Sequence, residues 1–244
     1  MLHIIYIKIL SYLIEVIDYK NKKKVINFFK EKFLENKINL IDIGAHKGET
    51  IKVFLKNFNI DRILSFEANT KIFEALNNKL INEKLTNVTL INSGIGDQNE
   101  KKKLKVFHET SSSTFNQINQ NTKYYQRKKK YLSFLSKNKN EEYEEITVQV
   151  NPLSYFEEFK MLDRVDILKI DTEGYELKVL KEIKKEDIEK IRFIYFEHHY
   201  DLMIKKNYKY FEIKNFLNQN NFHLKLKLKM NFRKTFEYIY EKVE

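Results

Sequence analysis

An acidic residue and two glycines at the end of an apolar run form the segment of this chain best suited to chemistry. Asp42 lies in the run, and Gly44 and Gly48 enclose Ala45 and His46 in the turn after it. A strand that ends in a glycine turn and continues into a helix lets a ligand approach bare backbone N–H groups near the helix N-terminus. These five residues are therefore expected to contact a ligand.

A second acidic residue follows the next apolar run, at residues 63–66. Glu67 lies 19 residues after Gly48. That is close to the offset of about 20 residues at which an acid reaches ribose hydroxyls in nucleotide-binding βαβ units. The spacing predicts a cofactor that contains a nucleoside, with Glu67 and its neighbour Ala68 beside it.

The spacing of the glycines distinguishes between nucleoside cofactors. A dinucleotide site needs the pattern G-x-G-x-x-G, which lets a pyrophosphate lie against the helix. This chain has D-x-G-x-x-x-G instead, and the carboxylate of Asp42 would repel a pyrophosphate. A carboxylate suits an ammonium group, such as the one on the methionine part of S-adenosylmethionine (SAM). The turn therefore favours SAM, with an ordinary tight turn as the alternative.

Other acidic residues also stand where apolar runs end. Asp97, Asp171 and Glu197 each follow such a run, as Glu67 does, and Asp42 lies near the end of its own. In open α/β sheets, ligands bind in the crevice beyond the carboxyl ends of the strands. One acid in that position is commonly a helix cap, but the set predicts a shared site.

The elements that must position these residues alternate between strand and helix. Buried strands are expected at residues 40–43, 63–66, 88–92, 165–170 and 191–196, and alternating strands at 222–230 and 236–240. A βαβ series closed by an antiparallel hairpin predicts an open, doubly wound α/β sheet.

Composition sets broad limits. A chain of 244 residues, 42% of them hydrophobic, can bury one core of ordinary size. The absence of cysteine excludes a disulfide framework and a thiolate metal site. The net charge of +11 would suit nucleic acid or an anionic membrane, but only five of the 45 basic residues are arginine. Because nucleic-acid sites favour clustered arginine as well as lysine, we prefer a genome-wide bias as the explanation and do not expect a nucleic-acid partner.

Residues 1–36 are expected to form an N-terminal helical extension and residues 37–244 the main domain. Residues 2–17 are strongly apolar but shorter than the roughly 20 residues that span a bilayer. Their polar residues recur at helical spacing, which favours a helix packed on the domain over one at a membrane surface. The start of the chain lacks signal-peptide features, so a cytoplasmic protein is expected, with peripheral membrane contact through residues 2–17 as the alternative.

Several segments, in order, resemble the FkbM-type SAM-dependent methyltransferases. They are D-I-G-A-H-K-G-E-T, S-F-E-A-N, I-N-S-G-I-G-D, the run at residues 111–114, I-L-K-I-D-T-E-G-Y-E-L-K-V-L and F-E-H-H. The resemblance covers roughly residues 38–226, and its most specific part is L-K-I-D-T-E-G-Y-E at residues 168–176. It implies a class I methyltransferase fold, Rossmann-like with seven strands, and methyl transfer to oxygen, often on a sugar or glycan-like acceptor.

The resemblance also implies roles for individual residues. The turn that contains Asp42, Gly44 and Gly48 would hold the methionine side of SAM, and Glu67 would bind the ribose hydroxyls. Gly94 and Ile95 would flank the adenine, and Asp171 and Glu173 would lie beside the reacting centre.

A sugar hydroxyl is a poor nucleophile, so a general base or a divalent cation must assist its methylation. The candidates are Asp171, Glu173, Glu197, His198 and His199. The two histidines could equally be residues of a surface loop. A carboxylate-bound Mg²⁺ stays open as well, because Asp and Glu are suitable oxygen ligands. The metal dependence is therefore not predicted.

Lys169 stands inside a predicted strand, where a buried charge is rarely tolerated without a partner. The next strand should lie beside it and ends in Glu197. We therefore predict an ion pair between Lys169 and Glu197.

Residues 117–145 separate two alternating stretches, 103–107 and 146–150, that are expected to pair. So long a gap in a compact domain is usually functional or disordered. Tyrosines alternate with cations at residues 123–131, and such residues can stack on sugar rings and meet phosphate or carboxylate. We interpret the segment as a lid, helical around residues 122–136, over an anionic, sugar-bearing acceptor. A solvated surface helix is the alternative.

Two other functions stay open. An RNA or DNA methyltransferase would use the same cofactor half, although base N-methyltransferases typically resemble Asn/Asp-Pro-Pro-aromatic where this chain has D-T-E-G-Y. A non-catalytic, membrane-associated scaffold would use residues 1–17 and a vestigial cofactor site. The sequence predicts neither the acceptor's identity nor the oligomeric state.

Overall fold

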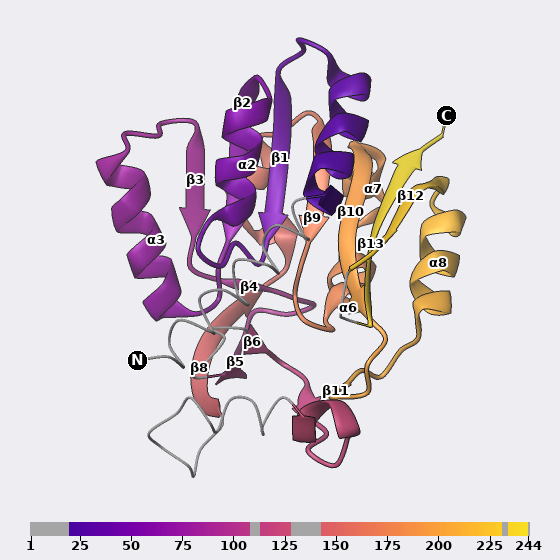
Figure 1. Ribbon diagram of the computed structural model, residues 1–244. Helices are drawn as coiled ribbons and strands as arrows, with labels where there is room; N and C mark the ends of the chain where they lie inside the picture. Colours follow the sequence, from indigo (N-terminus) through magenta and orange to yellow (C-terminus); the bar gives the residue numbers. More distant parts are fainter. Residues whose placement is uncertain (1–19, 108–112, 128–142, 231–233, 244) are drawn as a thin grey trace, which may run out of the picture.

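The computed structural model describes residues 20–107, 113–127, 143–230 and 234–243 (Figure 1). The described part forms three layers, with helices on both faces of a seven-stranded sheet and a smaller sheet at one end of it. The apolar stretch at residues 2–17 lies outside the described residues. Within them, no helix combines the length and the apolar character needed to cross a membrane.

The central sheet has the strand order β12-β13-β10-β9-β1-β2-β3. In chain order its strands are β1 (Ile38–Ile43), β2 (Ile60–Phe66), β3 (Val88–Ile91), β9 (Val165–Ile170), β10 (Ile191–His199), β12 (Phe222–Lys229) and β13 (Thr235–Lys242). The first five pair in parallel, and β13 is antiparallel to both β10 and β12. The expected doubly wound sheet with a C-terminal antiparallel hairpin is confirmed.

Helices connect the strands and cover the sheet. Residues 20–33 and 123–127 are helical. The other helices are α2 (Glu49–Asn57), α3 (Thr70–Asn82), the 3-10 helix η1 (Leu153–Tyr155), α5 (Glu157–Lys160), α6 (Glu176–Lys181), α7 (Lys185–Glu189) and α8 (Tyr210–Gln219).

A smaller sheet closes one end of the molecule. It is formed by β4 (Gly94–Ile95), β8 (Tyr143–Asn151), β5 (Glu100–Phe107) and β6 (Ser113–Thr114), and β11 (Ile204–Lys205) pairs separately with β7 (Gln117–Ile118). Lys103 is opposite Thr147 in this sheet, so the predicted pairing of the two alternating stretches is confirmed. In Figure 1 these strands lie near the arrowheads of β1 and β3, where the acidic residues were expected.

The segment interpreted as a lid has different bounds in the structure. Its first two residues form β7, and its last three begin β8, because that strand starts at Tyr143. Residues 123–127 are helical, and residues 128–142 lie outside the described residues.

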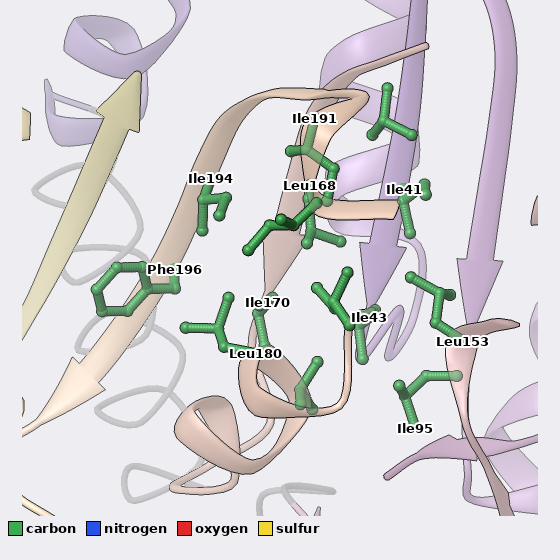
Figure 2. Packing of buried hydrophobic residues seen from close by; sticks show 14 of the residues in the cluster. Ile41, Ile43, Ile95, Leu153, Leu168, Ile170, Leu180, Ile191, Ile194 and Phe196 are labelled. Atoms are coloured by element: carbon green, nitrogen blue, oxygen red, sulfur yellow. The ribbon is translucent and has the colours of Figure 1, made fainter. Parts of the chain in front are cut away.

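Two apolar clusters pack on opposite faces of the central sheet, because side chains alternate along each strand. One includes Ile41, Ile43, Leu168, Ile170, Ile194 and Phe196 of the sheet, with Leu180 of α6 (Figure 2). The other includes Leu40, Ile167, Phe193 and Ile239 of the sheet, with Phe54 of α2. Phe29, from the helix at residues 20–33, packs edge-on against Phe193 with ring centroids 5.5 Å apart. That helix therefore contributes to the core.

Candidate active site

A pocket of about 440 Å³ lies at the carboxyl ends of the central strands. Its walls include residues that the sequence singled out for the cofactor: Gly44, Ala45, His46, Glu67, Ala68, Gly94 and Ile95. They also include the predicted catalytic residues Asp171, Glu173 and Glu197, and three residues that the sequence did not single out, Lys22, Tyr195 and Glu237. One pocket thus joins both predicted halves of the site.

The turn between β1 and α2 requires glycine at both of its predicted positions. Gly44 has a φ of +89°, and a Cβ there would lie 2.0 Å from the backbone oxygen of Asp171. Gly48, with a φ of +81°, precedes α2, and a Cβ there would lie 2.7 Å from the side chain of Leu76. Gly48 therefore shapes the turn from outside the pocket, while Gly44 allows β1 to approach β9 closely.

The backbone N–H groups of this turn are not bare, contrary to the expectation from the sequence. Those of Gly44 and Ala45 donate to the backbone oxygen of Phe66, and that of His46 donates to Glu67. We therefore expect the turn to contribute to ligand binding through its shape, because these three backbone N–H groups are not free to donate to a ligand.

Glu67 closes the turn from the end of β2. Its Oε2 accepts the backbone N–H of His46 at 2.8 Å, and its Oε1 accepts that of Asn69 at 2.8 Å. Burial raises the pKa of the Glu67 carboxyl, and the two N–H donors act against this. Each oxygen keeps a second acceptor position, so the carboxylate can accept hydroxyl groups from within the pocket.

The wall formed by β4 and β5 is narrow and apolar. A Cβ on Gly94 would lie 2.9 Å from the ring of Phe115, and Ile95 and Leu104 line the pocket beside them. Flat aromatic ligands fit such walls because ring faces and aliphatic side chains pack closely.

Asp42 and Lys169 form a buried ion pair at the floor of the pocket, which Lys169 lines. The two residues are in register on β1 and β9. Lys169 Nζ lies 3.3 Å from Oδ1 of Asp42 and 3.5 Å from Oδ2 of Asp171. Burial lowers the pKa of Lys169, but these carboxylates outweigh burial and raise it, so the lysine is charged. Asp42 is fully buried and does not line the pocket, which corrects its expected contact with the cofactor.

The predicted ion pair between Lys169 and Glu197 is wrong: among the described residues, Lys169 pairs with the two aspartates instead. The register of β9 and β10 places Lys169 opposite Tyr195, two residues before Glu197. Glu197 lies beside His199, with Oε1 3.2 Å from Nε2.

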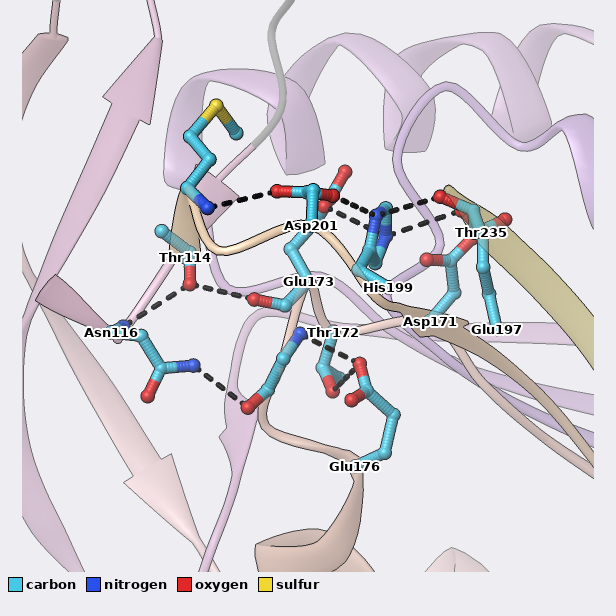
Figure 3. Close-up of polar contacts among 12 residues, drawn as sticks. Thr114, Asn116, Asp171, Thr172, Glu173, Glu176, Glu197, His199, Asp201 and Thr235 are labelled. Carbon is cyan, nitrogen blue, oxygen red and sulfur yellow. Dashed lines mark hydrogen bonds and ion pairs between the residues drawn. The ribbon is translucent and has the colours of Figure 1, made fainter. Parts of the chain in front are cut away.

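His199, at the end of β10, is surrounded by polar side chains (Figure 3). Its Nε2 lies 3.1 Å from Oε2 of Glu173 and 3.2 Å from Oε1 of Glu197. Its Nδ1 lies 3.1 Å from Oγ1 of Thr235 and 3.7 Å from Oδ2 of Asp201. His199 does not itself line the pocket, whereas both glutamates do. It therefore stands behind the two carboxylates and fixes their positions.

The charges of this cluster are tuned by its surroundings. Burial lowers the pKa of His199, but the surrounding carboxylates, first among them Glu173, outweigh burial and raise it well above its usual value. Burial, together with the charge of Asp171, raises the pKa of Glu197 to about 7. The imidazole is therefore cationic at neutral pH, and Glu197 titrates in the range where a general base works best.

The T-E-G segment after β9 is a strained turn that other elements hold in place. Glu173 has a φ of +49°, unusual for a residue with a side chain, and Gly174 has a φ of +96°. The side chains of Thr114 and Asn116 donate to the backbone oxygens of Glu173 and Gly174, both at 2.8 Å. Glu176 accepts the N–H of Gly174 at 2.8 Å. The turn thereby holds the Glu173 side chain beside His199 (Figure 3), where it lines the pocket.

His198 does not join the site, which corrects its expected catalytic role. Its side chain alternates to the opposite face of the sheet from its two neighbours. Its ring is buried and packs against Tyr200, Tyr208 and Tyr210, with centroids 4.9 to 5.8 Å away. Burial lowers the pKa of His198 to about 3, so the ring is neutral.

Tyr195 and Glu237 are pocket residues that the sequence analysis missed. They lie on the neighbouring strands β10 and β13, and the Tyr195 hydroxyl donates a hydrogen bond to Oε1 of Glu237. The only available signal was the alternation of residues 236–240, which places residue 237 on the face opposite to its apolar neighbours.

The described ranges contain no group of three or more His, Cys, Asp or Glu residues arranged to hold a metal ion. The Mg²⁺ considered from the sequence therefore has no support in this part of the chain.

A family model described as the methyltransferase FkbM domain matches residues 42–224. The chain belongs to the FkbM methyltransferase family. The matched range begins near the end of β1 and includes the T-E-G turn and His199. The helix at residues 20–33 and Glu237 lie outside the range that matches the FkbM domain. No curated protein matches the chain.

Solved structures share this fold at low sequence identity. An FkbM methyltransferase from Methylobacillus flagellatus KT has a TM-score of 0.52 and 16% identity, and covers 84% of this chain and 44% of its own. This chain therefore spans less than half the length of that protein. An uncharacterised protein from Listeria monocytogenes serotype 4b has a TM-score of 0.50 and 11% identity, over 92% of this chain and 68% of its own. A candidate RNA methyltransferase from Pyrococcus horikoshii has a TM-score of 0.49 and 11% identity, over 92% and 84%.

These similarities establish a class I methyltransferase fold with a Rossmann-like sheet, as expected from the sequence. At such identities they establish the fold alone and do not identify a substrate.

Proposed function

We propose that this protein is a SAM-dependent O-methyltransferase whose acceptor is a hydroxyl group of a sugar or glycan-like molecule. The observation that carries the proposal is the pair of carboxylates, Glu173 and Glu197, that line the pocket and both lie against Nε2 of His199. A hydroxyl needs a base to become a good nucleophile. This arrangement supplies one beside a pocket that fits a nucleoside cofactor.

Three features support binding of SAM in the β1–β2–β4 half of the pocket. The Gly44 turn leaves room where a side chain would collide with β9. The carboxylate of Glu67 has acceptor positions for ribose hydroxyls, and the slot beside Gly94 and Phe115 suits an adenine ring. SAM, when bound, supplies a methyl group that is already activated by its sulfonium.

In the proposed mechanism, Glu197 would accept the proton of the acceptor hydroxyl as that oxygen bonds to the methyl carbon and the methyl–sulfur bond breaks, which would leave S-adenosylhomocysteine. The cationic His199 stabilises the carboxylate form of Glu197, which burial and Asp171 would otherwise make too basic. Thr235 and Asp201 hold the ring of His199 from its other nitrogen. Glu173 is the second candidate for the base, because its Oε2 lies 3.1 Å from Nε2 of His199, almost as Oε1 of Glu197 does at 3.2 Å.

The division of the chain is part of the proposal. Residues 1–36 form the helical extension and residues 37–244 the methyltransferase domain, with a lid-like segment at about 117–145. Lys22 and Val25 of the helix at residues 20–33 line the pocket, which supports a role for the extension in enclosing the acceptor.

The experiment that tests the function is transfer of a labelled methyl group from SAM to fractionated glycans, nucleic acids and small metabolites. The expected product is a methyl ether on a sugar hydroxyl, formed without added metal and in the presence of a chelator. Label in RNA, with a steep dependence on salt, would replace this proposal with the nucleic-acid alternative. Absence of SAM binding would favour the non-catalytic scaffold.

A further inference from the structure

Glu237 is a buried carboxylate with one oxygen that no described residue satisfies. The residue is 8% exposed and lines the pocket. Its Oε1 accepts a hydrogen bond from the Tyr195 hydroxyl, and its Oε2 has no hydrogen-bond partner among the described residues. A buried carboxylate oxygen left without a donor is costly, so its persistence beside a pocket points to a donor that arrives with a ligand.

Other carboxylates of the pocket already lie within ion-pair distance of a basic side chain. The pairs are Asp171 with Lys169, Glu173 and Glu197 with His199, and Glu49 with His46. Glu67 accepts two backbone N–H groups instead. Glu237 differs from them, since its one hydrogen-bond donor among the described residues is a neutral phenol, and the charges of Lys169 and Lys22 act on it only from beyond ion-pair distance. Burial raises the pKa of the Tyr195 hydroxyl well above its usual value, so the phenol stays protonated.

Glu237 lies on the side of the pocket away from the cofactor half. The order β1-β9-β10-β13 separates its strand from that of Gly44 by three strand spacings, or about 14 Å at roughly 4.8 Å each. It is in register with Glu197, the proposed base, on the adjacent strand. A group bound at Glu237 would therefore belong to the acceptor and would lie next to the hydroxyl being methylated.

We propose that Glu237, with Tyr195, forms a subsite for a protonated amine on the acceptor, and that the substrate class is an amino sugar or a similar amino alcohol. This inference rests on the proposed function and adds the chemical group that the site selects. An ammonium group has three donors. One reaches Oε2 of Glu237, and the tyrosine oxygen, whose proton is directed at Oε1, can accept another.

The subsite also bears on the expectation of an anionic acceptor. That expectation depends on cations at residues 123–131, which lie partly outside the described residues. On the wall that faces the reacting centre, Glu237 has no cation within ion-pair distance among the described residues, so an anionic group placed against it would be repelled. Near the methylated hydroxyl, the structure therefore favours a cation.

The experiment measures binding of aminodeoxyhexoses, with the amine at C2, C3, C4 or C6, and of their N-acetylated counterparts. Calorimetry or saturation-transfer NMR is carried out on the full chain saturated with S-adenosylhomocysteine. The wild-type protein is expected to bind at least one free amine about tenfold or more tightly than its N-acetyl form. Glu237→Gln, which keeps the shape and an acceptor for Tyr195, is expected to abolish that preference. Tyr195→Phe, which leaves the charge in place, is expected to retain it.

Glu241→Gln is the matched control, because Glu241 is on the same strand but pairs with Lys32 and Lys225 outside the pocket. It is expected to leave the preference unchanged. Equal binding of amines and N-acetyl forms by the wild-type protein would overturn the inference, whatever the folding of the variants. An unchanged preference in Glu237→Gln would overturn it too. In either case, retained binding of S-adenosylhomocysteine would leave the proposed function standing, whereas its loss would remove the proposed function first.

Discussion

Carboxylates at the ends of neighbouring strands behave differently in this protein because their partners differ. Glu67 accepts backbone N–H groups and keeps acceptor positions for a cofactor. Asp42 is buried against a lysine and serves the fold. Glu197 lies against an imidazolium and titrates near neutrality. The residue type alone does not distinguish these roles. The group that each carboxylate contacts (a backbone N–H, a lysine or an imidazolium) does.

Replacing Glu173 by Gln tests its place at the reacting centre. The amide keeps the shape of the side chain but cannot act as a base, so turnover is expected to fall about 100-fold. Affinity for S-adenosylhomocysteine, measured by calorimetry, is expected to stay unchanged. Glu186→Gln, at an exposed position on α7, is the control. Wild-type turnover in the Glu173 variant would assign the role to Glu197 alone.

The pH dependence of turnover tests Glu197. Its carboxyl, with a pKa of about 7, must be deprotonated to act as a base, so activity is expected to rise with pH through that value. His199→Gln removes the positive charge that lowers the pKa of Glu197 and leaves the charges of Asp171 and Glu173, which raise it. The acid limb of the profile should therefore move to higher pH. A limb that stays in place would show that another group controls it.

At the scale of elements, the register of β1, β9 and β10 decides which side chains meet. Asp42 is opposite Lys169, and Lys169 is opposite Tyr195, so one row of polar groups crosses three strands at the floor of the pocket. The next row consists of carboxylates. Asp171 follows the last residue of β9, and Glu197 of β10 is in register with Glu237 of β13. Of the lower row, Asp42 is buried in the sheet while Lys169 and Tyr195 reach the pocket, and the carboxylates of the upper row all line it.

Lys169→Met tests the lower row. It leaves Asp42 buried without its partner, so the free energy of unfolding, measured with urea, is expected to fall by about 3–5 kcal/mol. The double variant Asp42→Val/Lys169→Met removes both charges and is expected to recover most of this loss, because an apolar pair can replace a buried ion pair. A double variant no more stable than the single one would show that the pair contributes little.

Much of the fold follows from local sequence, and much of the site does not. Apolar runs predicted the core strands because burial on both faces selects Ile, Leu and Val, and the turn residues predicted where strands end. The partner of Lys169 was mispredicted because strand adjacency does not specify register. His198 was assigned to the site although alternation places it on the opposite face from His199. Glu237 was missed because its significance depends on Tyr195, 42 residues earlier in the chain.

At the scale of the whole molecule, the pocket is assembled from two parts of the chain. The cofactor half comes from β1, β2 and β4, within the range that matches the FkbM domain. The opposite side adds Lys22 from the N-terminal helix and Glu237 from the C-terminal hairpin, both outside that range. We therefore expect the cofactor half to be common to the family and the acceptor side to carry the specificity of this protein.

Calorimetric titration of S-adenosylhomocysteine into the wild-type protein and Glu67→Ala tests the central claim most directly, with Glu144→Ala, a surface ion-pair residue, as the control. The wild-type protein and the control are expected to bind alike. Glu67→Ala is expected to bind at least about tenfold more weakly, since a hydrogen bond to a charged group contributes about 1.5–3 kcal/mol. Circular dichroism should show that the variant stays folded. No binding by the wild-type protein, or equal affinity in a folded Glu67→Ala variant, would contradict the assignment of this pocket to SAM.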